Sequence, residues 1–264
     1  MKKLLEDKMK AKKIVVIALA MIMALCTFTA CGSDEPADLS DQTLMVFSGA
    51  GLAEPVQEMA DTFKEQTGCE VEIVFNGTGA LISQIQTTES GDILIAGALD
   101  EIAAMEEEEV VATHEMVKHI PVVAVQKGNP LGVESVKDLG AEGLTVLLPD
   151  PETTPIGKIA VKAFEDNGII DTIDIVANTT TAPLAMTALA EGNADAAVIW
   201  KENGAKNENI TVLDLPEMEK YIKVVPAVEL SYSENEEARI AFIEFMTGEE
   251  GMAIWAKYGY EAVE

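Results

Sequence analysis

Two short glycine-rich segments carry hydroxyl groups at positions where they could take part in chemistry. Ser48 precedes a turn that ends at Gly51, and Thr78 lies between Gly77 and Gly79. Glycine lets a backbone approach a ligand closely, and the N–H groups at a helix N-terminus favour a bound anion. Because hydroxyl and amide groups donate hydrogen bonds, both segments could contact a bound anion. For Thr78, the N-cap of the following helix is an equally good interpretation.

The residues that could support catalysis or hold a metal cation lack the necessary spacing. His114 and His119 are five positions apart, so on a helix they would fall on different faces. No cysteine and histidine cluster suits zinc, and no Gly-x-Ser-x-Gly segment supports a triad hydrolase. The acidic run 106–109 lacks the pattern of a calcium loop, which favours a solvated helix end. We therefore expect no enzymatic activity, no cofactor and no metal-cation site.

The elements around the glycine-rich turns alternate between strands and helices. Short apolar runs alternate with segments in which apolar residues recur every three or four positions. In the first helix this spacing joins Val56, Met59, Ala60 and Phe63, after Pro55 in the opening turn. The first series of strands and helices is 44–47, 53–66, 71–75, 80–88 and 93–96. This order predicts a parallel α/β sheet.

A second α/β series follows, and the chain ends in helices. Its strands are continuous apolar runs, which are typical of parallel strands covered on both faces. The predicted strands are 121–126, 145–148, 173–176 and 196–200, and the predicted helices are 155–167 and 182–191. A strand at 223–230 and helices at 236–246 and 249–258 complete the chain.

The two series predict two lobes joined by two crossing segments. The strand-like segments 119–127 and 223–228 lie where the chain could pass between the lobes. Residues 43–121 and 226–264 would form lobe 1, and residues 122–225 would form lobe 2. The roughly 230 residues after the N-terminal segment are enough to bury a core of this kind.

The first thirty residues are typical of a bacterial lipoprotein signal. Lysines precede an apolar run at 14–26, and small residues then precede Cys31. Because this run is shorter than the roughly twenty residues that cross a bilayer, residues 1–30 are predicted to be a signal peptide. We expect a lipidated Cys31, a flexible tether at 31–42, and anchoring to the extracytoplasmic face of the cell membrane. Met9 begins a conventional signal too, so residues 1–8 could be an upstream extension.

Charge and cysteine content restrict the partners and the source of stability. The chain of 264 residues has a net charge of −28, which becomes −32 after removal of residues 1–30. This acidity disfavours nucleic acid and anionic lipid as partners, and it favours a solvated, self-repelling surface. Once Cys26 is removed and Cys31 is acylated, Cys69 alone remains, so no intramolecular disulfide is expected.

Four segments together resemble the ModA family of molybdate-binding proteins. They are 46–52 (VFSGAGL), 75–81 (FNGTGAL), 122–130 (VVAVQKGNP) and 150–157 (DPETTPIG). Glycine-rich turns are common in α/β proteins, whereas the order and separations of these four segments are more specific. The resemblance spans nearly the whole chain after the signal. It implies a type II periplasmic-binding-protein fold, in which each lobe is a mainly parallel sheet flanked by helices and two hinge crossovers join the lobes.

The same resemblance implies which residues donate hydrogen bonds to an oxyanion in the cleft. The ligand-binding positions are Ser48, Gly51, Thr78, Ile156, Ala182 and Trp200, of which Ile156 and Ala182 would use the backbone N–H. Two positions depart from the family, because Gly51 replaces a usual serine and Trp200 replaces a usual tyrosine. The Trp200 indole either donates from a different point or only packs. Asp150 would repel a dianion, so we expect it to form a turn and to point away from the ligand.

What the resemblance implies is an extracytoplasmic solute-binding protein of an ABC importer. It would capture molybdate or tungstate and deliver it to a permease that works with an ATPase. No cofactor is expected beyond this bound ligand, and the chain would act as a monomer. Two alternatives stay open: a receptor for another anion, such as sulfate, phosphate or a small organic anion, and a sensory lipoprotein of the same fold.

Overall fold

A computed structural model describes residues 38–205 and 207–263 of the chain. The predicted signal peptide, the Cys31 lipidation site and most of the predicted tether lie outside the described residues. Within the described part, no helix has the length and apolar character needed to cross a membrane.

The first sheet combines a parallel half with an antiparallel half. β1 (Thr43–Gly49) lies between β2 (Glu70–Asn76) and β3 (Ile93–Ile95) and is parallel to both. β10 (Lys223–Leu230) pairs antiparallel with β3 and with β4 (Val110–His119), and β11 (Glu261–Ala262) pairs with β4. The strand order is β11-β4-β10-β3-β1-β2. We call this sheet and its helices lobe 1.

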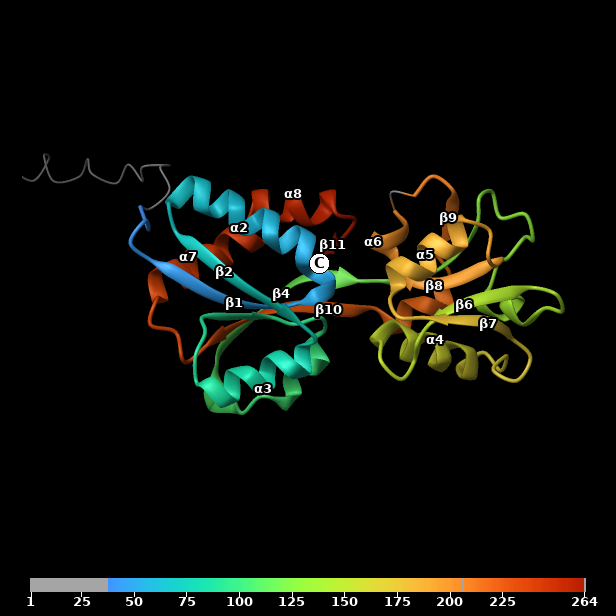
Figure 1. Ribbon diagram of the computed structural model, residues 1–264, viewed down its shortest axis with the longest axis horizontal. Coiled ribbons are helices and arrows are strands. Elements are labelled where there is room, and N and C mark those ends of the chain that lie inside the picture. Colours follow the sequence, from blue (N-terminus) through green and yellow to red (C-terminus); the bar gives the residue numbers. More distant parts are fainter. Residues whose placement is uncertain (1–37, 206, 264) are drawn as a thin grey trace, which may run out of the picture. The chain divides into compact units, whose positions relative to one another are not determined.

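Helices cover both faces of this sheet. In Figure 1, α2 (Ala53–Thr67), α7 (Glu236–Thr247) and α8 (Glu249–Lys257) lie on one face, and α3 (Thr78–Thr88) lies on the other. Short 3-10 helices, η2 (Leu99–Ala104) and η3 (Glu107–Glu109), follow β3 on the face of α3, and η1 (Ala50–Leu52) joins β1 to α2.

Alternating residues of β1 supply two separate apolar layers. Val46 packs with Phe63 in the layer of α2, α7 and α8, whereas Phe47 packs with Leu81 in the layer of α3. Successive side chains of a strand point to opposite faces, so one apolar run serves both layers. Burial of one such side chain contributes about 1.5–3 kcal/mol, which explains why the run is apolar throughout.

The second sheet repeats this arrangement. β6 (Thr145–Pro149) is parallel to β7 (Asp174–Thr179) and β8 (Ala196–Trp200), and β5 (Pro121–Gln126) is antiparallel to β8 and to β9 (Ile210–Leu213). The strand order is β7-β6-β8-β5-β9. Its helices are α4 (Pro155–Asp166), α5 (Ala182–Ala190), α6 (Lys201–Gly204), η4 (Val136–Gly140) and η5 (Pro216–Tyr221). We call this sheet and its helices lobe 2.

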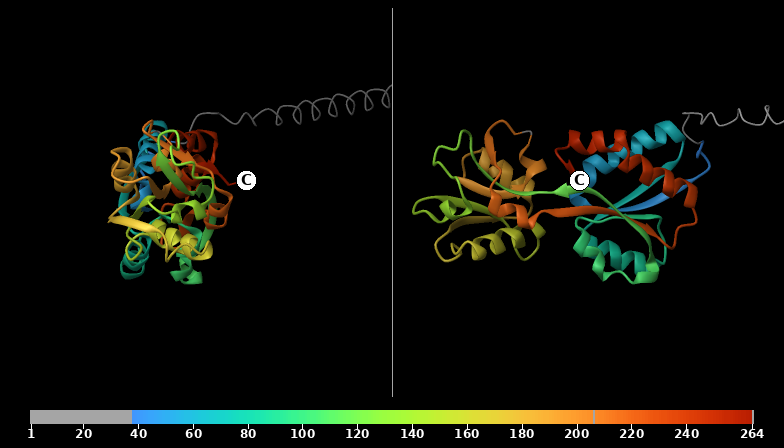
Figure 2. Two further views of the ribbon diagram at one scale, coloured as in Figure 1. Left: turned by 90° about the vertical axis from the view of Figure 1, so that its right-hand side faces the viewer. Right: turned by 180° about the vertical axis from the view of Figure 1, so that it is seen from behind.

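The chain passes between the lobes along two neighbouring segments. β4 ends at His119 and β5 begins at Pro121, while β10 begins at Lys223, which pairs directly with His119. Figure 2 shows both segments from behind.

Lys201, which follows β8, forms ion pairs with Glu261 of β11 at 2.9 Å and with Asp214 at 3.2 Å. Its hydrogen bond to Glu261 raises the pKa of Lys201, so the ammonium holds residues of both lobes together at this point.

The structure confirms the two-lobed α/β fold and adds features that local pattern did not reveal. Each sheet contains antiparallel strands beside its parallel ones, and residues 110–118, which were not predicted as a strand, form most of β4. His114 and His119 therefore lie on a strand and not on a helix. The prediction of a solvated helix end was wrong for Glu109, which is buried and accepts hydrogen bonds from the Gln86 amide and the Glu106 N–H.

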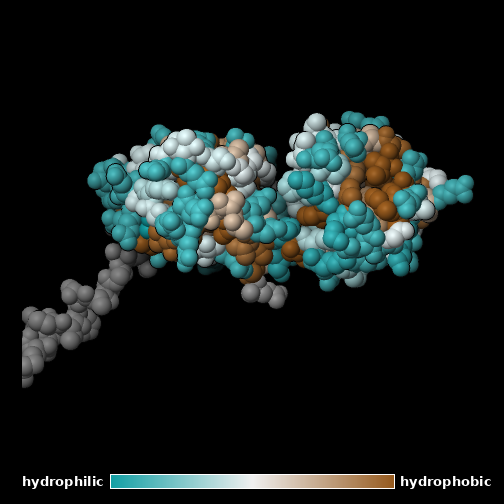
Figure 3. Space-filling view, turned by 90° about the horizontal axis from the view of Figure 1, so that it is seen from below, coloured by the Kyte–Doolittle hydropathy of each residue, from teal (hydrophilic) through white to brown (hydrophobic). Residues whose placement is uncertain are grey.

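The surface is mostly hydrophilic, as the acidic composition suggests. In the view from below in Figure 3, an apolar area lies on lobe 2. The large apolar side chains exposed on this lobe are those of Leu131, Ile170, Val176 and Leu184. Some exposed apolar surface of this kind is ordinary for a folded domain.

Candidate functional site

A cavity of about 590 Å³ is lined by loops of both lobes. In lobe 1 the walls come from the segments that follow β1, β2 and β3, because the carboxyl ends of parallel strands meet at one edge of a sheet. In lobe 2 the walls come from the start of α4 and the end of β8. His119 and Lys223, where the chain crosses between the lobes, complete the lining.

Three glycines leave the lobe 1 wall open to a ligand. A Cβ atom added at Gly51, Gly77 or Gly79 would meet no other atom within 4 Å. Side chains therefore do not cover the backbone at these positions, as a site built from backbone N–H groups requires. The Gly77 N–H itself already donates to Asn76 Oδ1 at 2.8 Å, which leaves the positions of Gly51 and Gly79 for a ligand.

Thr78 is a lining residue whose hydroxyl holds the neighbouring loop. It is the first residue of α3, and Gly77 is the N-cap, so the N-cap interpretation of Thr78 is wrong. The Thr78 Oγ1 accepts a hydrogen bond from the Gly97 N–H at 3.1 Å. A hydroxyl that accepts one hydrogen bond still has its own proton to donate, so Thr78 can serve the loop and a ligand at once.

Among the six predicted ligand-binding positions, the structure brings Gly51, Thr78 and Trp200 to the cavity wall. Ser48 is fully buried, and its hydroxyl donates to the Gly49 carbonyl at 3.5 Å. Ile156 and Ala182 are buried in the first turns of α4 and α5, outside the lining.

The first turn of α4 still contributes to the cavity through the neighbours of Ile156. Thr154 caps this helix by accepting from the Gly157 N–H at 3.1 Å, and Pro155 occupies the opening turn. Pro155, Lys158 and Ile159 line the wall. Asp150 does not line the cavity, and its carboxylate accepts from the Glu152 N–H at 2.9 Å, as expected of a turn former.

Trp200 does not stand alone at the end of β8. Its ring stacks on the His119 ring, with centroids 3.7 Å apart and planes 21° apart. His119 is itself held by Glu202 Oε1, 2.8 Å from Nε2, and by the Gly97 carbonyl, 3.4 Å from Nδ1. Sequence reasoning missed this role of His119; the signal was its position at the start of a predicted crossing segment.

Tyr260 supports the first glycine-rich turn from the C-terminal end of the chain. Its hydroxyl donates to the Gly51 carbonyl at 3.5 Å, and its ring lies 5.9 Å from His119. Burial raises the pKa of Tyr260 far above its ordinary value, so the phenol stays neutral and keeps its proton for Gly51.

Four charged side chains also line the cavity, and local sequence gave no signal for them. Lys223 pairs with Asp100 at 2.5 Å. Lys158 and Glu101 make no hydrogen bond or ion pair through their side chains within residues 38–205 and 207–263. The neutral donor set expected from the resemblance is therefore accompanied by a cation and a carboxylate without partners.

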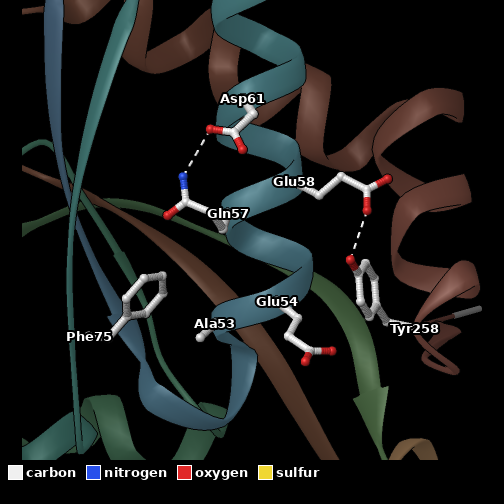
Figure 4. Close-up of a pocket in the computed structure, with 7 residues that line it drawn as sticks. All are labelled: Ala53, Glu54, Gln57, Glu58, Asp61, Phe75 and Tyr258. Carbon is white, nitrogen blue, oxygen red and sulfur yellow. Dashed lines mark hydrogen bonds between the residues drawn. The ribbon is translucent and has the colours of Figure 1, made fainter.

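A second hollow, of about 660 Å³, lies against α2 and is lined by acidic side chains (Figure 4). Two pairs of its side chains are hydrogen-bonded, because Tyr258 donates to Glu58 at 2.8 Å and Gln57 donates to Asp61 at 3.0 Å. The Glu58 hydrogen bond raises the pKa of the Tyr258 phenol. These carboxylates would repel an anion, so this hollow does not suit the oxyanion that the resemblance implies. In the part of the chain that the structure describes, no three His, Cys, Asp or Glu side chains gather into a metal-cation group.

Sequence comparison identifies relatives along almost the whole chain. A Haemophilus influenzae protein described as a binding protein is 28% identical to this chain over 253 residues, which cover 94% of this chain and 98% of the relative. The molybdate-binding protein ModA of Escherichia coli is 23% identical over 226 residues, covering 82% and 88%. The substrate-binding domain assigned to a molybdenum ABC transporter of Clostridium difficile shares the fold, with a TM-score of 0.72, 22% identity, and coverage of 84% and 99%.

The two α/β lobes and the cavity between them define a two-lobed solute receptor of the type II periplasmic-binding-protein fold. The chain belongs to the bacterial extracellular solute-binding protein family, whose model matches residues 44–261. This membership implies an extracytoplasmic location and a bound solute.

Proposed function

We propose that the chain captures a small oxyanion in the cavity between the lobes and delivers it to the permease and ATPase of an ABC importer. The observation that carries this proposal is the wall of lobe 1, where Gly51, Gly77 and Gly79 leave backbone open beside the Thr78 hydroxyl. Molybdate or tungstate is the first candidate ligand, supported by the similarity to ModA proteins. Such an anion offers acceptors that suit hydroxyl and N–H donors. The chain acts in this proposal as a binding protein without catalysis, and as a monomer.

The remaining predicted donors belong to the same proposal. The backbone N–H groups of Ile156 and Ala182 lie in the first turns of α4 and α5, from which movement of the lobes would bring them to a ligand. Ser48 is buried at the end of β1 and would donate only after its hydroxyl turns from the Gly49 carbonyl toward the ligand. The proposed lobes are residues 43–121 with 226–264, and residues 122–225. A ligand bound to one lobe would recruit the other and favour a closed form that the permease recognises.

Lipidation at Cys31, after a signal peptide at 1–30, would hold the receptor on the cell membrane through the 31–42 tether.

A second candidate is an anion other than molybdate, because the cavity departs from the neutral donor set. Gly51 removes one expected hydroxyl and Trp200 replaces a phenol with an indole. Lys158 adds a cation without a partner, and Glu101 adds a carboxylate without a partner, among the described residues. Sulfate, phosphate and small organic anions are therefore included in the test.

Isothermal titration of the ligand-free chain from Asp38 onward tests the proposal. Molybdate, tungstate, sulfate, phosphate and chromate are compared at one salt concentration. Tight binding of molybdate or tungstate, with sulfate at least about a thousand-fold weaker (roughly 4 kcal/mol), supports the first candidate. Binding of phosphate or sulfate in preference supports the second, and no binding of any anion contradicts the proposed function.

A further inference from the structure

The cavity holds two opposite side-chain charges that the described protein does not neutralise. Lys158 projects from α4 of lobe 2, and Glu101 lies in η2 of lobe 1. Neither side chain forms a hydrogen bond or an ion pair within residues 38–205 and 207–263, whereas Lys223 and Asp100 satisfy each other. A ligand that fits this cavity must therefore meet a free cation and a free carboxylate.

The carboxylate of Glu101 lies near Thr78, whose hydroxyl is the proposed hydrogen-bond donor to the anion. A Cβ atom added at Gly97 would stand 3.2 Å from Glu101 Oε2 and 3.7 Å from Thr78 Oγ1. Oε2 is buried and has no hydrogen-bond partner among the described residues. A buried acceptor without a donor costs free energy, so a turn of this cavity-lining carboxylate toward an entering donor would relieve that cost.

This neighbourhood discriminates between two kinds of oxyanion. A fully deprotonated tetrahedral dianion offers only acceptors, so the Glu101 carboxylate repels it and gains no hydrogen bond. An oxyanion that carries an O–H group can donate that proton to Glu101. Its charged oxygens remain available for Thr78, the glycine-rich backbone and Lys158.

We propose that Glu101 determines the specificity of the cavity by accepting a hydrogen bond from the ligand, so that the site selects an oxyanion bearing its own hydroxyl donor. This inference rests on the proposed oxyanion-receptor function and narrows its ligand class to the second candidate, an anion other than molybdate or tungstate. The hydroxyl belongs either to the anionic group itself, as in hydrogen phosphate, or to the carbon skeleton of a phosphate monoester. Both sources share the chemistry that Glu101 recognises.

Titration of the purified full-length chain at pH 7.5 tests the inference with five probes. Hydrogen phosphate and glycerol phosphate carry a hydroxyl, whereas sulfate, molybdate and methyl phosphate carry none as dianions. We expect the chain to bind at least one hydroxyl-bearing probe ten-fold or more tightly than sulfate. Preference for glycerol phosphate over hydrogen phosphate would place the hydroxyl on the carbon skeleton, and the reverse order would place it on the anionic group.

The Glu101→Gln variant keeps the shape of the side chain but adds an amide donor. It should lower the affinity ratio of the preferred probe to sulfate at least ten-fold, because the amide can donate to a bare oxygen. Asp100→Asn is the matched control, since it removes a neighbouring carboxylate of the same cavity that is already paired with Lys223. It should shift all five affinities together. Lys158→Gln should weaken all five affinities together and also leave the ratio unchanged.

The outcomes separate the inference from the function on which it rests. Preference of the unmodified chain for sulfate or molybdate, or an unchanged ratio in a folded Glu101→Gln variant, overturns the inference and leaves an oxyanion receptor in place. Circular dichroism establishes that each variant is folded. Failure of the unmodified chain and of every variant to bind any probe would overturn the proposed function, and the inference with it.

Discussion

Thr78→Val separates the structural role of the Thr78 hydroxyl from its role toward a ligand. Valine keeps the shape of threonine but cannot accept the hydrogen bond that the Gly97 N–H donates at 3.1 Å. Loss of a partner for such a group destabilises a protein by about 1–3 kcal/mol. In a chain of this size, each kcal/mol lowers the Tm by roughly 2–4 °C. The variant should therefore melt several degrees below the unmodified chain in the absence of ligand.

The same substitution should weaken ligand binding for a second reason. The hydroxyl proton of Thr78 has no acceptor within the described residues, and the side chain lines the cavity. A hydrogen bond to a charged ligand is worth about 1.5 kcal/mol, which corresponds to a roughly ten-fold rise in Kd. Thermal denaturation measures the first effect and isothermal titration measures the second. Thr78→Ser is the matched control, because serine can both accept from Gly97 and donate to the ligand.

Two results would refute this reasoning about Thr78. If Thr78→Val has the same Tm as the unmodified chain, the Gly97 hydrogen bond does not stabilise the fold. If its Kd for the preferred anion also equals that of Thr78→Ser, the hydroxyl does not reach the ligand. A lower Tm with unchanged Kd would restrict Thr78 to positioning the Gly97 loop.

Three further predictions concern the turns around the cavity and one capping carboxylate. Gly157→Ala should destabilise the chain by about 1–3 kcal/mol or more in urea unfolding, because its Cβ would lie 2.1 Å from the Pro149 carbonyl oxygen; Gly77→Ala, which meets open space, is the control. Gly51→Ser should tighten sulfate or molybdate binding up to roughly ten-fold in titration, since the new hydroxyl enters open space on the cavity wall. Hydrogen bonds from a backbone N–H and a serine hydroxyl lower the pKa of Asp138, so its stabilisation is present above the unfolded value of about 4 and is lost as pH falls. The stability difference between Asp138→Asn and the unmodified chain should therefore narrow in acid, and a constant difference from pH 7 to 3 would contradict this assignment.

Local sequence was sufficient for the parts of the fold that depend on neighbouring residues. The alternation of Val46 and Phe47 between two apolar layers, and the turns at Gly51 and Thr78, follow from periodicity and from glycine. The antiparallel pairing of β4 with β10 was not predictable in this way. It places Lys223 opposite His119, more than a hundred positions earlier, and no local pattern encodes so distant a pairing.

The charged lining of the cavity was hidden for a related reason. Glu101 lies in a stretch whose sequence is typical of a solvated acidic surface, and Lys158 follows an ordinary helix start. Their importance comes from the absence of partners for their side chains among the described residues, which only the folded arrangement reveals. Comparison with a family could not supply it either, because a resemblance carries over the positions that match and is silent about those that differ.

His119, which the sequence analysis considered only as a catalytic candidate, connects the cavity-lining residues Gly51, Thr78 and Trp200 through its contacts. Gly97 donates to the Thr78 hydroxyl through its N–H and contacts His119 Nδ1 through its carbonyl. His119 stacks on Trp200 and lies beside Tyr260, whose hydroxyl contacts the Gly51 carbonyl. His119 also occupies the last position of β4, where the chain leaves lobe 1 for lobe 2. The cavity-lining groups of lobe 1 and the Trp200 ring of lobe 2 are therefore supported by one residue at the crossing point, so we expect a change in the arrangement of the lobes to alter these contacts.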